Sequence, residues 1–200
     1  MEQLTPKVFA WMEKGIDGFS PEAVAAHYKL YEGYVKKANE INARLTGLDF
    51  DPAKANATFS EVRELKVALA FALGGVRNHE TYFGHLGNGK SEPDGKLLEA
   101  INRDFESVEN WKKDMKATAL SARGWAWLVY NYDEKRLMNC IGDSQNTFPL
   151  WNSLVVVALD VYEHAYWRDY LTDRAGYIDN FFANLDWTEP CRLGDQMTGE

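Results

Sequence analysis

Two long segments in the first half of the chain carry apolar residues at the three- and four-residue spacing of an α-helix. The first covers about residues 20–45, with Ser20 as a plausible N-cap and Pro21 at the first helical position. The second covers about residues 60–86 and is apolar on much of its circumference, which predicts a buried helix. A loop over 46–58 would join the two segments into a helical hairpin.

A pair of glycines, Gly74 and Gly75, interrupts the second apolar segment. Each glycine in a helix interior costs roughly 1 kcal/mol relative to alanine. The pair therefore predicts that another part of the chain approaches the helix backbone closely there, or that the helix kinks.

The best boundary in the chain is the stretch over 87–95, which contains three glycines and one proline. Glycine and proline mark turns and linkers. We expect an N-terminal α-hairpin domain over residues 1–90 and a C-terminal α/β domain over residues 91–200.

The pattern changes twice after this boundary. One or two helices are expected over 97–121, followed by a β-hairpin formed by 125–130 and 137–141. The short apolar run over 154–159 predicts a buried central strand, and the tail from Glu163 onward is helical again. The order of helices, small antiparallel sheet and helices is that of an α+β protein with three strands.

Composition and charge narrow the function classes. The 200 residues are 46% hydrophobic and 26% charged, which is too apolar for a disordered chain, and the net charge of −8 argues against nucleic-acid binding. No run approaches the ~18 apolar residues of a membrane span, and the N-terminus lacks the signature of a signal peptide, so a cytoplasmic protein is expected. Cys140 and Cys191 have no CxxC spacing, which excludes a disulfide framework or a zinc ribbon.

Three of the four histidines are candidate metal ligands. His27 lies on the aromatic face of the first helix, where an ordinary core or interface histidine is the plainer interpretation. His79 lies near the end of the buried second helix, where a satisfied core histidine and a ligand are about equally supported. His85, beside Gly84, is expected to be exposed and without a role.

Asp160 ends the most apolar run of the chain, and His164 follows four residues later. A buried carboxylate is costly unless it is paired or bound to a cation, so the spacing indicates a shared metal. With His27 and His79, these residues form a set of three imidazoles and one carboxylate, which suits Mn, Fe or Zn. Several aromatic residues would form a nearly dry shell suited to redox chemistry on a very small substrate: Tyr34, Trp125, Trp127, Tyr162, Tyr166 and Trp167.

The sequence around these residues resembles the iron/manganese superoxide dismutases along nearly the whole chain. Residues 160–166, Asp-Val-Tyr-Glu-His-Ala-Tyr, resemble the family signature Asp-Val-Trp-Glu-His-Ala-Tyr. Residues 74–79 are similar to the family segment Gly-Gly-His-x-Asn-His, and residues 124–128 to its Gly-Trp-Gly-Trp-Leu strand. Tyr34-Val35 and Asn39 match the family pattern on the first helix.

The resemblance implies a superoxide dismutase, an oxidoreductase that converts superoxide to oxygen and hydrogen peroxide. It implies one Mn or Fe per chain, a homodimer or homotetramer, and the two-lobe fold described above. A metal-binding relative with a different redox or structural role is the alternative. An α+β protein with ordinary core histidines would require all of these matches to coincide by chance.

The resemblance also assigns site residues. His79, Asp160 and His164 match the metal ligands, and Tyr34 matches the gateway tyrosine. Gln145 matches the glutamine that hydrogen-bonds metal-bound solvent, and with Gly75 it forms the manganese-type arrangement. Among the surrounding residues, Trp127 belongs to the matching strand, Glu163 matches a residue that reaches across a dimer, and Arg174 matches a basic residue of the substrate funnel.

The first helix departs from the family pattern. Without a gap, the ligand position falls on Ala26. Either this helix lacks a one-residue bulge that the family carries, which would bring His27 into the ligand position and is the interpretation we favour, or the ligand is lost. The second active-site histidine is replaced by Leu30 or Tyr31. Trp167 stands at the position of the family's usual aromatic partner across the interface, and its indole cannot accept a hydrogen bond. Tyr162 and Phe83 occupy positions where the family usually has tryptophan. An altered proton-delivery network is therefore expected.

Overall fold

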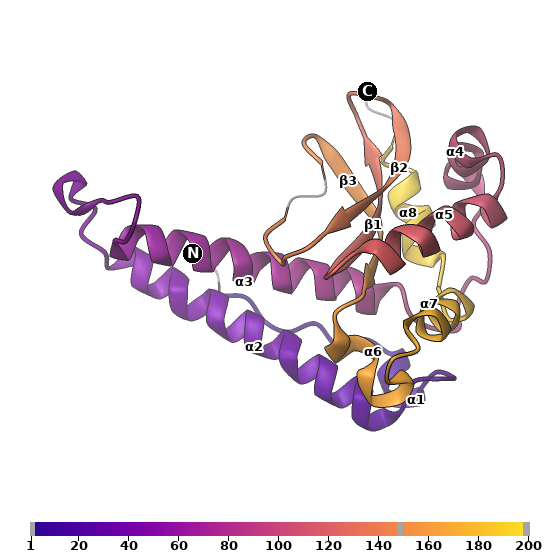
Figure 1. Cartoon of the computed structure of the whole chain (residues 1–200), viewed down its shortest axis with the longest axis horizontal. Helices are drawn as coiled ribbons and strands as arrows, with labels where there is room; N and C mark the ends of the chain where they lie inside the picture. The colour runs from indigo at the N-terminus through magenta and orange to yellow at the C-terminus, as the bar shows by residue number, and fades with distance from the viewer. Residues whose placement is uncertain (1–2, 148–149, 198–200) are drawn as a thin grey trace.

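The computed structural model describes residues 3–147 and 150–197. Its helices and strands confirm the expected α+β class, with a three-stranded antiparallel sheet. The elements follow one another as α1 (Trp11–Lys14), α2 (Pro21–Thr46), the 3-10 turn Pro52–Lys54, α3 (Glu61–Gly84), α4 (Gly95–Phe105), α5 (Val108–Ser121), β1 (Trp125–Asn131), β2 (Arg136–Gly142), β3 (Ser153–Asp160), α6 (Glu163–Tyr170), α7 (Arg174–Ala183) and α8 (Thr188–Gly194). The α2–α3 hairpin extends away from the sheet and the C-terminal helices (Figure 1).

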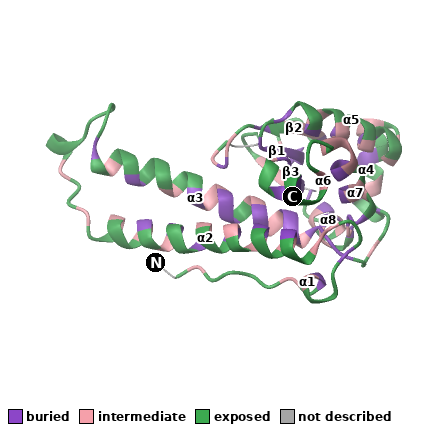
Figure 2. Cartoon of the chain, turned by 60° about the horizontal axis from the view of Figure 1, so that its bottom comes forward, coloured by how far each residue is buried: buried purple, intermediate pink, exposed green. Residues whose placement is uncertain are grey.

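Helix α2 begins where the sequence predicts. Ser20 is its N-cap and accepts a hydrogen bond from the main-chain N–H of Ala23, and Pro21 is its first residue. Its buried side chains recur every three or four residues along one face: Ala23, His27, Tyr31, Val35, Ala38 and Ile41. This stripe packs against α3, which lies beside α2 (Figure 2). The hairpin therefore holds two candidate histidines on facing helices.

The glycine pair in α3 permits two close approaches, as predicted. A Cβ atom on Gly74 would lie 1.8 Å from the main-chain oxygen of Gln145, and one on Gly75 would lie 2.6 Å from the ring of Tyr34. Neither distance is possible for real atoms. The two glycines thus bring the loop after β2 and a side chain of α2 against the same turn of α3.

The sheet has the order β2–β1–β3, so the central strand is β1 and the prediction of a central strand at 154–159 is wrong. The residues of β1 are all buried, whereas β3 is an edge strand whose burial is complete only over Val156–Asp160. Helices α3 and α8 pack against β3 and cover it. A continuous apolar run can therefore reflect helices that cover an edge strand, and it does not by itself indicate a strand with neighbours on both sides.

Three further features complete the architecture. The segment expected as one or two helices is two, because Glu106 adopts a left-handed φ of 70° and Ser107 then caps α5 through a hydrogen bond from Asn110 N–H. In the part of the chain that the structure describes, no helix has the length and hydropathy needed to cross a bilayer. Cys140 and Cys191 are free thiols.

Candidate metal centre

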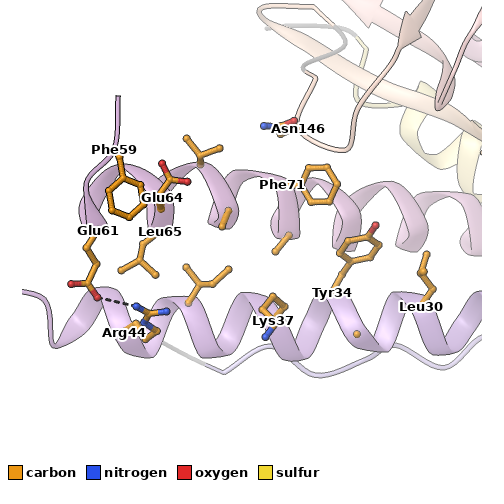
Figure 3. A pocket seen from close by; sticks show the side chains of 15 residues that line it. Leu30, Tyr34, Lys37, Arg44, Phe59, Glu61, Glu64, Leu65, Phe71 and Asn146 are labelled. Carbon is orange, nitrogen blue, oxygen red and sulfur yellow. Dashed lines mark hydrogen bonds and ion pairs between the residues drawn. The ribbon is translucent and has the colours of Figure 1, made fainter. Parts of the chain in front are cut away.

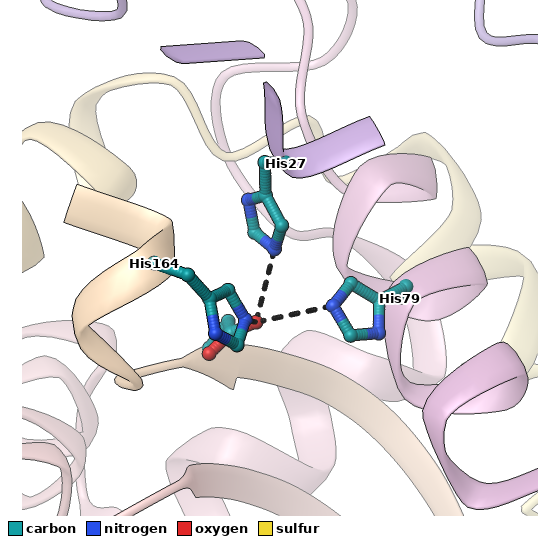
Figure 4. A group of neighbouring side chains, drawn as sticks. His27, His79 and His164 are labelled. Carbon is teal, nitrogen blue, oxygen red and sulfur yellow. Dashed lines mark hydrogen bonds and ion pairs between the residues drawn. The ribbon is translucent and has the colours of Figure 1, made fainter. Parts of the chain in front are cut away.

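Four side chains from four elements converge between the hairpin and the sheet. His27 comes from α2, His79 from α3, Asp160 from the end of β3 and His164 from the first turn of α6 (Figure 4). Their potential ligand atoms lie within 4.8 Å of one another. Nε2 of His27 and Nε2 of His164 each lie 3.1 Å from Oδ2 of Asp160, and Nε2 of His79 lies 3.5 Å from it.

The structure places His27, and not Ala26, in this group. Helix α2 runs without a π-bulge from Pro21 to Thr46. In that uninterrupted helix Ala26 is exposed, while the side chain of His27 is 4% exposed. The regular helical spacing therefore turns the available imidazole toward Asp160.

Hydrogen bonds from Tyr162 and Tyr177 hold Asp160 in place. Its Oδ1 accepts a hydrogen bond from Tyr162 N–H at 3.0 Å, and its main-chain oxygen accepts one from the Tyr177 hydroxyl at 2.6 Å. Oδ2 is left to face the three imidazoles. The carboxylate is fully buried, whereas the side chain of His164 is 30% exposed at the edge of the group.

Burial and charge set the protonation states. Burial alone would raise the pKa of Asp160, but the charge of His164 and the hydrogen bonds to His164 and His27 hold it well below its ordinary range. Burial lowers the pKa of His27, and burial together with the neighbouring His27 lowers the pKa of His79 to about 3. The centre thus combines a carboxylate with two neutral imidazoles, whereas Asp160 raises the pKa of His164, so a metal ion would compete with a proton there.

The tautomer of His79 provides a test of whether a cation fits. Nδ1 of His79 lies 2.6 Å from the main-chain oxygen of Gly75, so Nδ1 carries the proton and Nε2 presents a lone pair. Nε2 is buried and has no hydrogen-bond partner among the described residues, and its lone pair faces the carboxylate oxygen of Asp160. Two electron-rich atoms in a dry site are stabilised by a cation between them. Three nitrogens and one oxygen are suitable donors for Mn or Fe.

A second chain of polar groups borders the centre. The Gln145 side chain is buried, its Nε2 donates to the Tyr34 hydroxyl at 3.4 Å, and its Oε1 accepts from Trp125 Nε1 at 3.1 Å. Tyr34 and Trp125 both pack against His79, with ring centroids 5.4 and 5.3 Å away. The two hydrogen bonds fix which end of the Gln145 amide points at Tyr34.

The structure also places the three outer residues named from the sequence. Trp127 lies in the core of the sheet, where its ring occupies the space beside Gly142. Glu163 is exposed at the start of α6, next to His164. Arg174 donates to the main-chain oxygen of Ala122 and to the Tyr166 hydroxyl. The roles of Trp127, Glu163 and Arg174 stay predictions.

The expectation that His85 is exposed is wrong. Its side chain is 1% exposed, because the end of α3 is covered by β3 and by the chain at Leu185 and Asp186. Nothing in the local sequence indicates this, since Gly84 and the following linker are typical of a surface position. The sequence feature that relates to the burial of His85 is the apolar run of β3, because the outer side of this edge strand must be covered by another part of the chain.

A groove runs along the α2–α3 hairpin. It begins at Leu30 and Tyr34, has a volume of about 980 Å³ and is lined mainly by apolar side chains of α2 and α3 (Figure 3). At its far end Arg44 and Glu61 form an ion pair across it at 2.9 Å. Tyr34 thus lies between the open groove and the buried imidazole of His79.

Comparison with known proteins agrees with this geometry. A family model of the C-terminal domain of iron/manganese superoxide dismutases matches residues 93–192. An iron superoxide dismutase of Aquifex aeolicus is 40% identical over 177 residues, which cover 87% of this chain and 83% of that protein. A manganese superoxide dismutase of Halobacterium salinarum is 38% identical over 154 residues, which cover 71% of this chain and 76% of that protein. The chain belongs to the iron/manganese superoxide dismutase family.

Proposed function

We propose that this protein is a superoxide dismutase that converts two superoxide ions and two protons to oxygen and hydrogen peroxide at one Mn or Fe ion per chain. The observation that carries the proposal is the convergence of three imidazoles on Oδ2 of Asp160, with a lone pair of His79 that no described residue satisfies. The relatives named as iron and as manganese superoxide dismutases support both metals.

His27, His79, Asp160 and His164 would hold the ion. When bound, Mn or Fe supplies a one-electron couple that accepts an electron from one superoxide and returns it to another. Asp160 provides the single negative charge of the donor set, which favours the more oxidised ion. Because Asp160 is buried, little water screens its negative charge from a nearby metal ion.

Tyr34 and Gln145 would manage the protons that peroxide formation consumes. Burial and the charge of Asp160 raise the pKa of Tyr34, so the phenol stays protonated at neutral pH. Its oxygen accepts a hydrogen bond from Gln145, which leaves its proton free to point toward the centre or the groove. Trp125 fixes Gln145 from the other side and prevents the amide from flipping.

One observation favours the alternative of a relative with a different redox role. Tyr31 lies one turn after His27, where its hydroxyl accepts from Lys7 N–H and donates to Glu80. These partners direct its proton away from the centre. A protein with this arrangement would bind the metal but would supply slowly the second of the two protons that peroxide formation consumes.

We further propose a cytoplasmic homodimer in which α6 lies at the interface. Three neighbouring features support the interface: the side chain of His164 is 30% exposed, Glu163 is exposed beside it, and Trp167 is 45% exposed on the same short helix. A second copy would cover an otherwise open edge of the centre. Sedimentation of the wild type and of a Trp167→Glu variant tests this, because a charge on the covered face should shift the dimer toward monomer.

The activity is tested with protein loaded separately with Mn or Fe. Superoxide decay is followed together with its products, and one oxygen and one hydrogen peroxide per two superoxide ions are expected. Free metal at the same concentration is the control. Stoichiometric metal without faster decay would instead support the alternative role.

A further inference from the structure

His85 is the one histidine that the proposed chemistry does not use, and it is among the most buried. It is the C-cap residue of α3, six positions after His79 in the sequence. Its main-chain oxygen accepts a hydrogen bond from Asp186 N–H at 2.8 Å, and its imidazole borders a cavity of about 440 Å³ that Glu189 also lines. A buried imidazole with a fixed main chain can act as a rigid contact between elements.

That contact is made with β3. The main-chain N–H of Ala158 donates to Nδ1 of His85 at 3.4 Å. Because β3 is an edge strand, it presents N–H groups that the sheet does not pair, and a buried one needs an acceptor from elsewhere. Ala158 is fully buried, and His85 supplies that acceptor.

The hydrogen bond requires one particular form of the ring. Since Nδ1 accepts, the proton of the neutral imidazole lies on Nε2. This nitrogen is buried and unpartnered within the described ranges. A protonated ring would place a second N–H against the N–H of Ala158 and break the contact.

The contact joins the two elements that carry half of the donor set. Helix α3 carries His79, and Ala158 lies two residues before Asp160 on β3. A shift of β3 along α3 would change the 3.5 Å separation between His79 Nε2 and Asp160 Oδ2 directly. Donor groups must be held within about 0.5 Å for a metal site to keep its geometry.

We propose that His85 is a positioning residue for the metal centre, which sets the placement of Asp160 relative to His79 through the N–H of Ala158. The proposal rests on the proposed function only in taking these two side chains as metal ligands. It assigns to His85 no contact with metal or substrate.

Two substitutions distinguish the effect of the hydrogen-bond acceptor from the effect of the volume of the ring. His85→Asn places a carbonyl oxygen near the position of Nδ1, whereas His85→Leu fills the space and offers no acceptor. Amide hydrogen exchange at Ala158 reports the hydrogen bond itself. Mn²⁺ affinity by chelator competition, and the Mn²⁺ electron paramagnetic resonance spectrum of the loaded protein, report the geometry of the centre.

We expect His85→Leu to speed exchange at Ala158, to weaken Mn²⁺ binding about tenfold or more and to alter the spectrum, with His85→Asn close to wild type. Unchanged exchange in His85→Leu would overturn the contact. Faster exchange with unchanged affinity and spectrum would overturn its link to the centre. An Asn variant as weak as the Leu variant would show that ring packing matters and the acceptor does not.

If His85→Leu fails to fold, His85→Gln replaces it, because its carbonyl lies one bond farther from the main chain, beyond Nδ1. We expect it to behave as described for the Leu variant. Slow superoxide decay by the wild type would overturn the proposed function and leave these comparisons standing. Equal Mn²⁺ affinities and spectra with fast decay would overturn the role of His85 alone.

Discussion

Nε2 of His27 lies 3.1 Å from Oδ2 of Asp160, although 133 residues separate them in the chain. The contact spans the hairpin and the sheet, so it exists only when both are folded against each other. It also decides the question that the sequence leaves open on α2, because Ala26, one residue earlier, faces solvent. A one-residue change of position on a helix rotates a side chain by about 100°.

His27→Ala should therefore lose most of the metal affinity, because one of four donors is removed and Asp160 stays buried with less compensation. Adding Ala26→His to this variant should not restore binding, since the new ring points outward. Metal content after dialysis measures both. Ala26→His alone is the matched control and should bind like wild type; restored binding in the double variant would contradict the geometry.

The glycines of α3 and α2 should respond in opposite ways to alanine. Gly74→Ala forces a Cβ atom into the main-chain oxygen of Gln145 and should cost about 1–3 kcal/mol of unfolding free energy. Gly33→Ala, in open space on α2, should stabilise by up to about 1 kcal/mol through helix propensity. Denaturant unfolding of the metal-free variants measures this, and equal effects would refute the close approach.

Gln145→Ala should keep the metal but change its reduction potential and lower the dismutation rate by about 10- to 100-fold. The reason is that Tyr34 and Trp125 both lose the amide that connects them. Asn146→Ala, the neighbouring residue at the groove, is the control and should keep wild-type activity. Full activity of Gln145→Ala would argue against the amide as part of the proton path.

His85 should make the metal-free protein sensitive to acid. Burial lowers its pKa to about 4 against 6.5 when unfolded, so the unfolded chain binds more protons between these values. Stability is retained above pH 6.5 and is lost as the pH falls toward 4, by about 3 kcal/mol at pH 4. Asp186 and Glu189 oppose the shift, and the cavity beside the ring also contains charged Lys7, Arg77 and Glu80.

The check is the pH dependence of the unfolding free energy in wild type and His85→Asn. The variant lacks the titrating ring, so its stability should fall less between pH 6.5 and 4. Identical slopes for the two proteins would mean that the buried ring does not carry this part of the acid sensitivity.

Much of the fold follows from local patterns in the sequence. The caps of α2, the apolar stripe that faces α3 and the glycine pair each specify a local structure that tertiary packing preserves. The strand order does not follow, because burial of β3 reflects its helical cover as much as its place in the sheet. The division into domains at residue 90 stays a prediction.

Part of the candidate site could also be predicted from a local pattern in the sequence. Asp160 at the end of an apolar run and His164 one turn later are a local signal of a buried charge that needs a partner. His85 and Trp125 act through contacts with residues far away in the sequence, Ala158 and Gln145, which no local pattern indicates. Their importance depends on how α3 packs on the sheet.

The most direct test of metal-dependent dismutation is the rate of superoxide decay measured against the amount of Mn or Fe bound per chain, from metal-free protein to full loading. We expect a rate that rises in proportion to bound metal and levels off at one ion per chain. We also expect an Asp160→Asn variant, which lacks the anionic donor, to give little activity at any loading. A rate that is independent of bound metal, or full loading without catalysis, would contradict the assignment.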